Sequence, residues 1–489
     1  DAAELDLDLD LDLNAQNLSH TPAVSNTVKP AFIPNEIFRD YDIRGHADKQ
    51  LDDESVFKIG QAIATEALLA GQHKLTIARD GRNSGLRIRD ALVKGILATG
   101  CDVIDIGITP TPVLYYATHK LATQAGIMIT GSHNAAEING FKIVVNGQSL
   151  HGEQIKQLAE RINNSDFKQG QGSIVEVDVD NDYAEEICSD VIAARPIKVV
   201  VDAGNGVGGD LLVKMLQQID CEVIALHCEV DGNFPNHAPD PSHKANLSDL
   251  INSISENNAD IGIALDGDAD RMVAVSGSGD VIPGDKLLAI FANDVVSRNP
   301  ASSVVFDVKC SRNLSRSITQ IGGRPVMWKS GHSNIKAKMQ ETSAILGGEY
   351  TGHYFFKERW YGFDDGIYSA LRLIELLTID DRTLDDRIAE MPASFSTEEL
   401  MLPVQQDEEK FSIMLALKSQ LNISDGTLTD IDGLRLDFPE GWGLIRASNT
   451  SANIAARFEA NTEEELQRIR ELFQQALLTI DSKLQLPAA

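Results

Sequence analysis

The sequence predicts an α/β protein: three similar α/β domains with mixed sheets, followed by a smaller C-terminal α+β domain. Its 489 residues correspond to about three or four domains at roughly 100–200 residues each. Short apolar runs alternate with helical stretches between residues 74 and 349, as in strands of parallel or mixed sheets that helices connect. After about residue 395 the pattern changes to a helix, several strands and a long helix over 462–480.

The α/β part divides into three blocks with the same alternation of strands and helices. The first block has expected strands at 74–80, 102–107 and 125–130, and a helix at 84–100. The second has strands at 198–204, 221–227 and 260–266, and helices at 209–219 and 246–258. The third has strands at 303–309, 325–328 and 344–349, and helices at 312–323 and 333–343. We therefore expect domains over 31–178, 179–280, 281–394 and 395–489.

Residues 1–30 differ from the rest of the chain. Leucine alternates with aspartate over residues 5–13, and the segment holds six acidic residues and one basic residue. Alternation with period two could form a strand, but the dense like charge favours a disordered acidic tail.

The overall charge and the cysteines limit the class of function. Lys and Arg number 43 against 73 Asp and Glu, a net charge of -30, which disfavours nucleic acid or anionic membrane as the partner. No apolar run approaches the roughly 20 residues of a membrane helix, and the acidic start lacks the basic segment of a signal peptide. The five cysteines form no CxxC pair, which indicates free thiols in a reducing compartment. We expect a cytoplasmic enzyme, monomeric, that acts on small molecules.

A candidate metal site follows the apolar strand at 261–265. Asp266, Asp268 and Asp270 alternate with small residues in the sequence DGDADR, so their carboxylates can converge on one hard cation. An EF-hand is excluded because arginine occupies its sixth position and glycine its twelfth. Without a cation the three carboxylates would repel one another, which disfavours a plain solvated turn. Mg²⁺ is the preferred ion, because it combines carboxylates with a substrate phosphate.

A candidate nucleophile lies in TGSHN, residues 130–134. This loop follows the strand at 125–130 and places the hydroxyl of Ser132 where the carboxyl edge of a sheet forms a crevice. The G-x-S-x-G elbow of hydrolases does not fit, because Asn134 occupies its last position. Lys142, in NGFK, adds a candidate proton donor or phosphate ligand.

Two further loops carry polar groups. GEYTGH, at 348–353, combines an acid, a hydroxyl and an imidazole between glycines, a pattern suited to the hydroxyls of a polyol, although a surface turn would explain it equally well. RASNTS, at 446–451, sets a guanidinium beside hydroxyl and amide donors, which suits a phosphate group. A polar turn at a strand end is its alternative.

A G-x-G-x-x-G match at 204–209 offers a rival reading. It lies between an expected strand and an expected helix, and Glu229 follows at about the distance of a ribose-binding acid. A dinucleotide-dependent dehydrogenase would, however, leave the other three loops unexplained, and these glycines can equally serve tight packing. A sugar-phosphate sensor without catalysis would not require a metal triad beside a serine.

Seven motifs in order resemble the α-D-phosphohexomutase superfamily, in its bacterial phosphomannomutase/phosphoglucomutase branch. They extend from residue 38 to near the C-terminus: FRDYDIRG (38–45), RDGR (79–82), TGSHN with NGFK (130–142), DGDADR (266–271), WKSGHS (328–333), GEYTGH (348–353) and RASNTS (446–451). The resemblance implies four domains around a central cleft, to which each domain contributes one loop. The sequence departs from the family pattern at several positions: Ala135, Ala136, Ala269, Tyr350, Thr351 and Ala452.

The resemblance also implies residue roles. Ser132 would be the phosphoserine and would bind Mg²⁺ together with Asp266, Asp268 and Asp270, with Arg271 beside them. The groups around the substrate would be Tyr41, Arg44, Lys142, Lys309, Ser330 and His332. Sugar hydroxyls would bind Glu349, Thr351 and His353, and the remote phosphate would bind Arg446, Ser448, Asn449 and Thr450. Lys142, Arg44 and His353 are candidates for the general acid and base.

The implied reaction is the reversible interconversion of mannose 1-phosphate and mannose 6-phosphate, and of the corresponding glucose phosphates. It would proceed through a phosphoserine enzyme and a hexose 1,6-bisphosphate intermediate. Phosphoglucosamine mutase activity stays an alternative within the superfamily, and the dehydrogenase is the alternative from another class.

Overall fold

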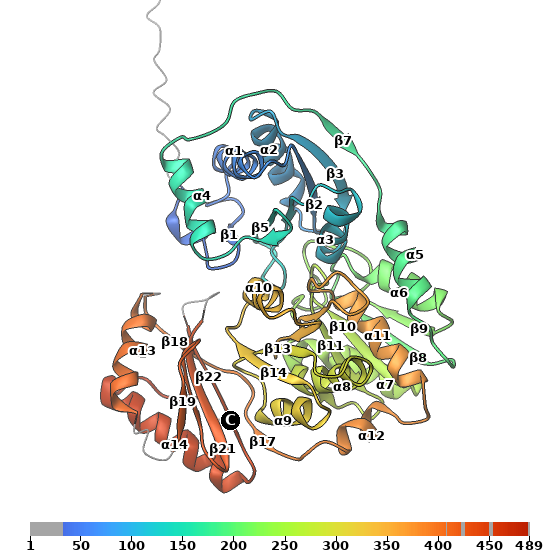
Figure 1. Ribbon diagram of the computed structural model, residues 1–489, viewed down its shortest axis with the longest axis vertical. Coiled ribbons are helices and arrows are strands. Elements are labelled where there is room, and N and C mark those ends of the chain that lie inside the picture. Colours follow the sequence, from blue (N-terminus) through green and yellow to red (C-terminus); the bar gives the residue numbers. More distant parts are fainter. Residues whose placement is uncertain (1–32, 407, 422–425, 449–452, 488–489) are drawn as a thin grey trace, which may run out of the picture. The chain divides into compact units, whose positions relative to one another are not determined.

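The computed structural model describes residues 33–406, 408–421, 426–448 and 453–487, and these residues have the predicted fold class. Four sheets with their own helices follow one another along the chain (Figure 1). The acidic tail expected over 1–30 lies outside the described residues, as do Asn449 and Thr450. Among the described helices, none combines the length and the apolar character that a membrane crossing requires.

The first sheet is mixed. Its strands are β1 (Ile43–His46), β2 (Lys74–Arg79), β3 (Asp102–Ile108), β4 (Gly126–Ile129), β5 (Ile138–Val145), β6 (Gln148–Ser149) and β7 (Ile174–Glu176). Their order is β1-β5-β4-β2-β3-β7, in which β4, β2, β3 and β7 are parallel and β5 is antiparallel to β4. The helices are η1 (Asn35–Ile37), α1 (Asp53–Leu69), α2 (Gly85–Leu97), α3 (Thr111–Lys120) and α4 (Glu153–Asn163). At the start of α1 the Asp52 side chain accepts a hydrogen bond from the Ser55 amide and so caps the helix.

The second sheet has a parallel centre and two antiparallel strands at one side. It contains β8 (Lys198–Asp202), β9 (Glu222–Leu226), β10 (Ile261–Leu265), β11 (Met272–Ser276) and β12 (Val281–Ile282), in the order β12-β11-β10-β8-β9. The associated helices are α5 (Asp180–Asp190), α6 (Gly209–Gln218), η2 (Lys244–Leu247) and α7 (Ser248–Asn257). Every residue of β10 is buried, which explains its continuous apolar sequence IGIAL.

The third sheet repeats this arrangement with fewer strands. It contains β13 (Ser303–Asp307), β14 (Arg324–Trp328), β15 (Leu346–Gly348) and β16 (Tyr354–Phe356), in the order β14-β13-β15-β16. Only β16 is antiparallel to its neighbour. The helices are α8 (Gly284–Arg298), α9 (Arg312–Gln320), α10 (His332–Thr342), α11 (Gly366–Thr378) and α12 (Leu384–Ala389).

The fourth sheet is antiparallel throughout. It contains β17 (Phe395–Ser396), β18 (Leu400–Pro403), β19 (Thr427–Thr429), β20 (Leu434–Asp437), β21 (Gly441–Ala447) and β22 (Asn453–Ala460). Its helices α13 (Glu409–Gln420) and α14 (Glu463–Ile480) lie on the same face of the sheet (Figure 1). The expected order was wrong in one respect, because the short strands β17 and β18 precede the first helix. Both strands pair with β22, a partner 50 residues or more further along the chain, so no local pattern marks them.

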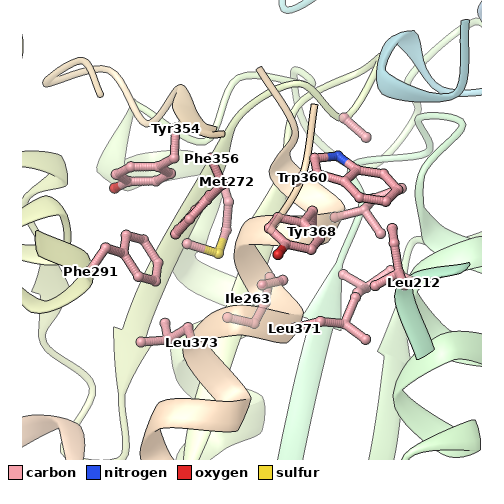
Figure 2. Packing of buried hydrophobic residues seen from close by; sticks show 14 of the residues in the cluster. Leu212, Ile263, Met272, Phe291, Tyr354, Phe356, Trp360, Tyr368, Leu371 and Leu373 are labelled. Carbon is pink, nitrogen blue, oxygen red and sulfur yellow. The ribbon is translucent and has the colours of Figure 1, made fainter. Parts of the chain in front are cut away.

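One buried apolar cluster joins the second and third sheets through α11. Figure 2 shows side chains of this helix between Phe291 of α8 and Leu212 of α6. Trp360 stacks on Tyr368 with ring centroids 5.0 Å apart, and Phe291 meets Tyr354 edge-on at 5.1 Å. Because these elements share one core, the loops that leave their sheets have a common rigid support.

Candidate functional site

Three predicted loops leave their sheets at equivalent positions. The loops at 130–137, 266–271 and 349–353 connect β4 to β5, β10 to β11, and β15 to β16. In each sheet the first of these strands is parallel to the strand on its other side, and the second is antiparallel to it. The repeated architecture therefore presents one polar loop from each of the three α/β sheets.

Ser132 lies at the tip of the first loop, in a backbone conformation that side chains rarely adopt. Its φ is +48°, in the left-handed region that costs a residue other than glycine of order 1–3 kcal/mol. Arg82 holds this loop, because its guanidinium donates hydrogen bonds to the carbonyls of Ser132, Asn134, Ala135 and Ile138 at 2.5–2.9 Å. Gly131 leaves room for this contact, since a Cβ there would lie 2.5 Å from the Arg82 Cζ.

The three aspartates of the second loop converge beside Ser132. One carboxylate oxygen from each of Asp266, Asp268 and Asp270 lies within 4.8 Å of the others, and all three residues are fully buried. Ser132 Oγ donates to Asp266 Oδ2 at 2.9 Å. Among the described residues, nothing donates a hydrogen bond to the buried Asp268 Oδ1. Ser132 Oγ and one oxygen from each aspartate thus converge, and Asp268 offers an oxygen atom that no donor uses. This arrangement fits a hard divalent cation.

Lys142 provides positive charge at the same place. Its ammonium group contacts Asp270 and lies 2.6 Å from Asp268 Oδ2. Burial alone would favour the neutral amine, but the Asp268 and Asp270 carboxylates outweigh it and raise the pKa of Lys142. Burial and the neighbouring carboxylates raise the pKa of Asp266 well above its usual value. Without a metal ion, therefore, burial and mutual repulsion oppose the ionisation of all three carboxyl groups at once.

His353 connects the triad to the third loop. Its Nε2 lies 3.2 Å from Asp270 Oδ1 and its Nδ1 lies 3.0 Å from Glu349 Oε2. Burial favours the neutral ring, but the two carboxylates outweigh it and raise the pKa of His353 to about 9. Glu349 also accepts a hydrogen bond from the backbone amide of Gly331 at 2.6 Å, which ties the third loop to the WKSGHS segment.

Asp307, at the end of β13, organises the residues around the third loop. It accepts hydrogen bonds from Ser330 Oγ at 2.8 Å and from the Tyr350 amide at 3.2 Å. Lys309 Nζ lies 3.9 Å from the same carboxylate and 3.3 Å from Glu399. These contacts hold the ammonium group of Lys309 in a buried position.

Arg446 belongs to β21 of the fourth sheet. Its Nε donates to Asp432 Oδ2 at 3.1 Å, and the same oxygen accepts from the Ser330 amide at 2.9 Å. The Nη2 atom of Arg446 is buried, and no described residue accepts a hydrogen bond from it. A buried guanidinium nitrogen with an unused donor fits an anionic ligand.

All these loops border one cleft of about 690 Å³. The three aspartates do not line it, because they lie behind its wall at the loop of Ser132. Tyr41 packs edge-on against the His332 ring at 5.3 Å, and Arg44 donates to Asn134 Oδ1 at 2.6 Å. The predicted site residues that line the cleft are Tyr41, Arg44, Ser132, Lys142, Arg271, Lys309, Ser330, His332, Glu349, Thr351, His353, Arg446 and Ser448.

The glycines at 204–209 pack against the loop of the aspartates. A Cβ at Gly206 would lie 2.7 Å from the Gly267 carbonyl oxygen, and one at Gly208 would lie 2.4 Å from the Ala269 Cβ. The Val207 amide donates to the Gly267 carbonyl at 3.1 Å. The match to a dinucleotide fingerprint thus reflects close backbone packing, as the alternative reading held.

Sequence reasoning missed the residues that position the predicted ones. Thr111 donates its hydroxyl to Asp268 at 2.5 Å, and neither Asp307 nor Asp432 was singled out. Arg82 was noted only within a motif, without a role. Asp307 at least ends a strand whose neighbours carry site loops, so its position at the sheet edge was a usable signal.

Comparison with known proteins agrees with this geometry. Family models for phosphoglucomutase/phosphomannomutase match four times: alpha/beta/alpha domain I at residues 35–169, domain II at 181–279, domain III at 283–395 and the C-terminal domain at 388–476. A phosphomannomutase/phosphoglucomutase of Pseudomonas aeruginosa is 50% identical over 462 residues, which are 94% of this chain and 100% of the relative. A phosphoglucomutase of Neisseria gonorrhoeae is 42% identical over 446 residues, which are 91% of this chain and 97% of the relative.

A crystal structure of a phosphoglucomutase/phosphomannomutase family protein from Burkholderia thailandensis is similar throughout. It superposes with a TM-score of 0.87 at 42% identity, covering 94% of this chain and 100% of the other. With four family models matched in order and relatives of this identity over nearly the full length, the chain belongs to the phosphoglucomutase/phosphomannomutase family.

Proposed function

We propose that this protein is a phosphohexomutase, an isomerase that interconverts mannose 1-phosphate and mannose 6-phosphate, and likewise the two glucose phosphates. One observation carries the proposal: a single cleft is lined both by Ser132, which contacts the buried aspartate cluster, and by Arg446, which has an unused buried donor. A mutase that moves a phosphoryl group between two ends of a sugar needs a reacting position and a second position for the other phosphate.

The reaction begins with phosphate on Ser132. The sugar hydroxyl forms a bond to phosphorus as the bond between phosphorus and Ser132 Oγ breaks, and the hydroxyl proton passes to a base. The product is a hexose 1,6-bisphosphate, which changes its orientation within the cleft so that its other phosphate faces Ser132. Ser132 Oγ then forms a bond to the phosphorus at the other end as the bond between that phosphorus and the sugar oxygen breaks, and the sugar oxygen takes up the proton held by the base. This restores the phosphoserine and releases the isomer.

Asp266, Asp268, Asp270 and Ser132 would hold Mg²⁺. When bound, this ion supplies positive charge that offsets the charge of the phosphoryl group during transfer. The unpartnered Asp268 Oδ1 and the repulsion among three buried carboxylates support this assignment.

Protein cations add to this stabilisation. Lys142 contacts the aspartates directly, and Arg271 follows them in the chain; both line the cleft. Arg44 also lines the cleft and donates to Asn134 of the Ser132 loop. The candidates for proton transfer stay Lys142, Arg44 and His353, because each lies close to the reacting position with a hydrogen-bonding group.

The other residues of the cleft would bind the sugar and the remote phosphate. Glu349, Thr351 and His353 would bind hydroxyls, while Tyr41, Lys309, Ser330 and His332 would surround the ring. Arg446 and Ser448 would bind the phosphate that is not reacting, with Asn449 and Thr450 from the same motif. We further propose domain limits at 31–178, 179–280, 281–394 and 395–489, with a monomer acting in the cytoplasm.

Ser132→Ala tests the proposal. Intact-mass analysis of the wild type should find a phosphorylated fraction that maps to Ser132, and the variant should lose this label with nearly all mutase activity. Ser173→Ala, at the edge of the same sheet, should keep both and serves as the control. Coupled assays with mannose, glucose and glucosamine phosphates separate the substrates, and NAD(H) turnover would identify a dehydrogenase. A Ser132→Ala protein with activity close to the wild type contradicts the mechanism.

A further inference from the structure

A second group of side chains that could hold a metal ion lies at the second sheet, outside the cleft. Asp202 ends β8, His227 directly follows β9, and His237 lies in the long connection before η2. One potential ligand atom from each residue lies within 4.8 Å of the other two. None of the three lines the cleft, so the proposed mutase chemistry does not account for them.

Both ring nitrogens of His237 face an oxygen atom. Its Nδ1 lies 2.9 Å from the Ala238 carbonyl oxygen, to which a ring N–H can donate. Its Nε2 lies 3.1 Å from both carboxylate oxygens of Asp202. With Nδ1–H donated to the Ala238 carbonyl, a cation can take the place of the proton between Nε2 and the buried Asp202 carboxylate.

His227 has the same kind of support. Its Nε2 lies 3.0 Å from Asp249 Oδ2, at the first turn of α7. With Nε2–H donated to this carboxylate, Nδ1 carries the lone pair that can bind a metal. Histidines that bind metal commonly donate their other ring N–H to a carboxylate or a carbonyl, and both histidines have such a partner.

We propose that Asp202, His227 and His237 bind Zn²⁺ or another borderline transition-metal cation, with water completing the coordination. Bonds of about 2.0–2.1 Å in a tetrahedral site place ligand atoms about 3.3 Å apart, close to the 3.1 Å between His237 and Asp202. Two imidazoles and one carboxylate select such a cation over Mg²⁺, which prefers oxygen ligands.

A metal ion bound to His237 would hold in place the segment after this residue, which reaches the cleft. Pro239 follows the ligand His237 by two residues and lies between the backbones of Gly204 and Gly267: a Cβ on either glycine would be 3.3 Å from it. Asp240 and the next four residues line the cleft. A Cβ on Gly267 would lie 2.6 Å from the carbonyl oxygen of Ser132, so these two backbones are in close contact. A metal at Asp202 would therefore stabilise the packing behind the loop of the aspartates.

Metal binding to the full chain tests the proposal. Protein stripped of metal is dialysed against Zn²⁺ in excess Mg²⁺, so that Mg²⁺ fills the Asp266 triad, and bound zinc is measured. The wild type and Asp268→Asn should each bind one equivalent, which His237→Ala should lose. His73→Ala removes an exposed histidine of the first sheet, and should bind zinc as the wild type does. Asp249→Ala, which removes only the partner of His227, should weaken binding about 10–100-fold.

Two measurements keep the test decisive if a variant folds poorly. Wild-type protein with one equivalent of Co²⁺, in excess Mg²⁺, should show the intense visible absorption of a four-coordinate ion with nitrogen ligands. Zn²⁺ should also raise the melting temperature of the wild type and leave that of the milder His237→Gln variant unchanged. Equal zinc binding in the wild type and His237→Ala, or a wild type without the Co²⁺ absorption, would overturn the proposal and leave Asp202 and His237 as an ion pair.

Discussion

The Nη2 atom of Arg82 donates a hydrogen bond to the carbonyl oxygen of Ser132 at 2.6 Å. The same fully buried guanidinium binds two further carbonyls of the loop and that of Ile138 at the start of β5, and its Nε donates to Asp80 at 3.0 Å. A strained φ at Ser132 persists only where the surroundings over-determine it, and Arg82 supplies that restraint. Arg82 is thus a positioning residue for the proposed nucleophile.

Arg82→Lys should lower kcat about 10–100-fold and change KM little. Lysine keeps the charge but cannot serve several carbonyls with a planar fork, so the Ser132 loop shifts while the remote phosphate site stays intact. Steady-state kinetics with glucose 1-phosphate measure both constants.

Arg87→Lys is the matched control, because Arg87 also donates to two backbone carbonyls of the same domain but lies away from the cleft. It should change neither kcat nor KM by more than about twofold. If Arg82→Lys instead raised KM and left kcat unchanged, Arg82 would not position the nucleophile.

Removal of metal should abolish turnover. Three buried carboxylates and the phosphoryl group that transfers beside them require compensating charge, and the protein supplies only part of it, through Lys142 and His353. EDTA should stop the reaction and Mg²⁺ should restore it, while Asp268→Asn should raise the Mg²⁺ concentration needed and lower kcat together. Full activity in EDTA would reject the metal assignment.

The cysteines should be slow to react in the native protein. Burial disfavours the thiolate and raises the pKa of Cys101, Cys221 and Cys228 to about 12, and that of the half-buried Cys188 to about 11. A thiol of pKa 12 is ionised to about one part in 10⁴ at pH 8, so alkylation should be slow there and accelerate as the pH rises.

The measurement is iodoacetamide labelling followed by mass spectrometry at pH 7, 8 and 9. All five thiols should react in guanidinium chloride, and Cys188 should react first in native protein. Rapid native labelling of Cys101 at pH 7 would contradict its burial.

Local patterns predicted the loops that meet at the cleft. The Asp266 loop follows a continuous apolar strand. When alternating acidic residues directly follow a buried strand, a metal site is one of few structures that explain them. The order of motifs then identified the family. Local patterns also predicted the positions of helices and strands. The apolar residues of α6 recur with helical spacing, and β10 is a continuous apolar run.

Long-range contacts explain what the sequence could not predict. Arg82 reaches its carbonyls across about 50 residues, and Asp432 joins Ser330 from 102 residues away. The first contact depends on β2 lying beside β4 in one sheet, and the second depends on how the third and fourth sheets pack; no local periodicity encodes either. The sequence also showed no sign of the group formed by Asp202, His227 and His237, because these residues meet only where two parallel strands end side by side.

Arg446→Ala should lower kcat/KM about 10–100-fold, and equally for mannose and glucose phosphates. The variant loses a charge-assisted contact to the remote phosphate, worth about 1.5–3 kcal/mol, and 1.36 kcal/mol corresponds to a tenfold rate change. Arg446→Lys should recover part of the loss, because it keeps the charge without the fork. Changes at Glu349 or Tyr350 should instead alter the ratio between the sugars, since these residues border the cleft at the third loop. Kinetics with both sugars for each variant separate the two roles. An Arg446→Ala enzyme that newly distinguishes mannose from glucose, or that keeps full activity, would show that this guanidinium does not hold the non-reacting phosphate.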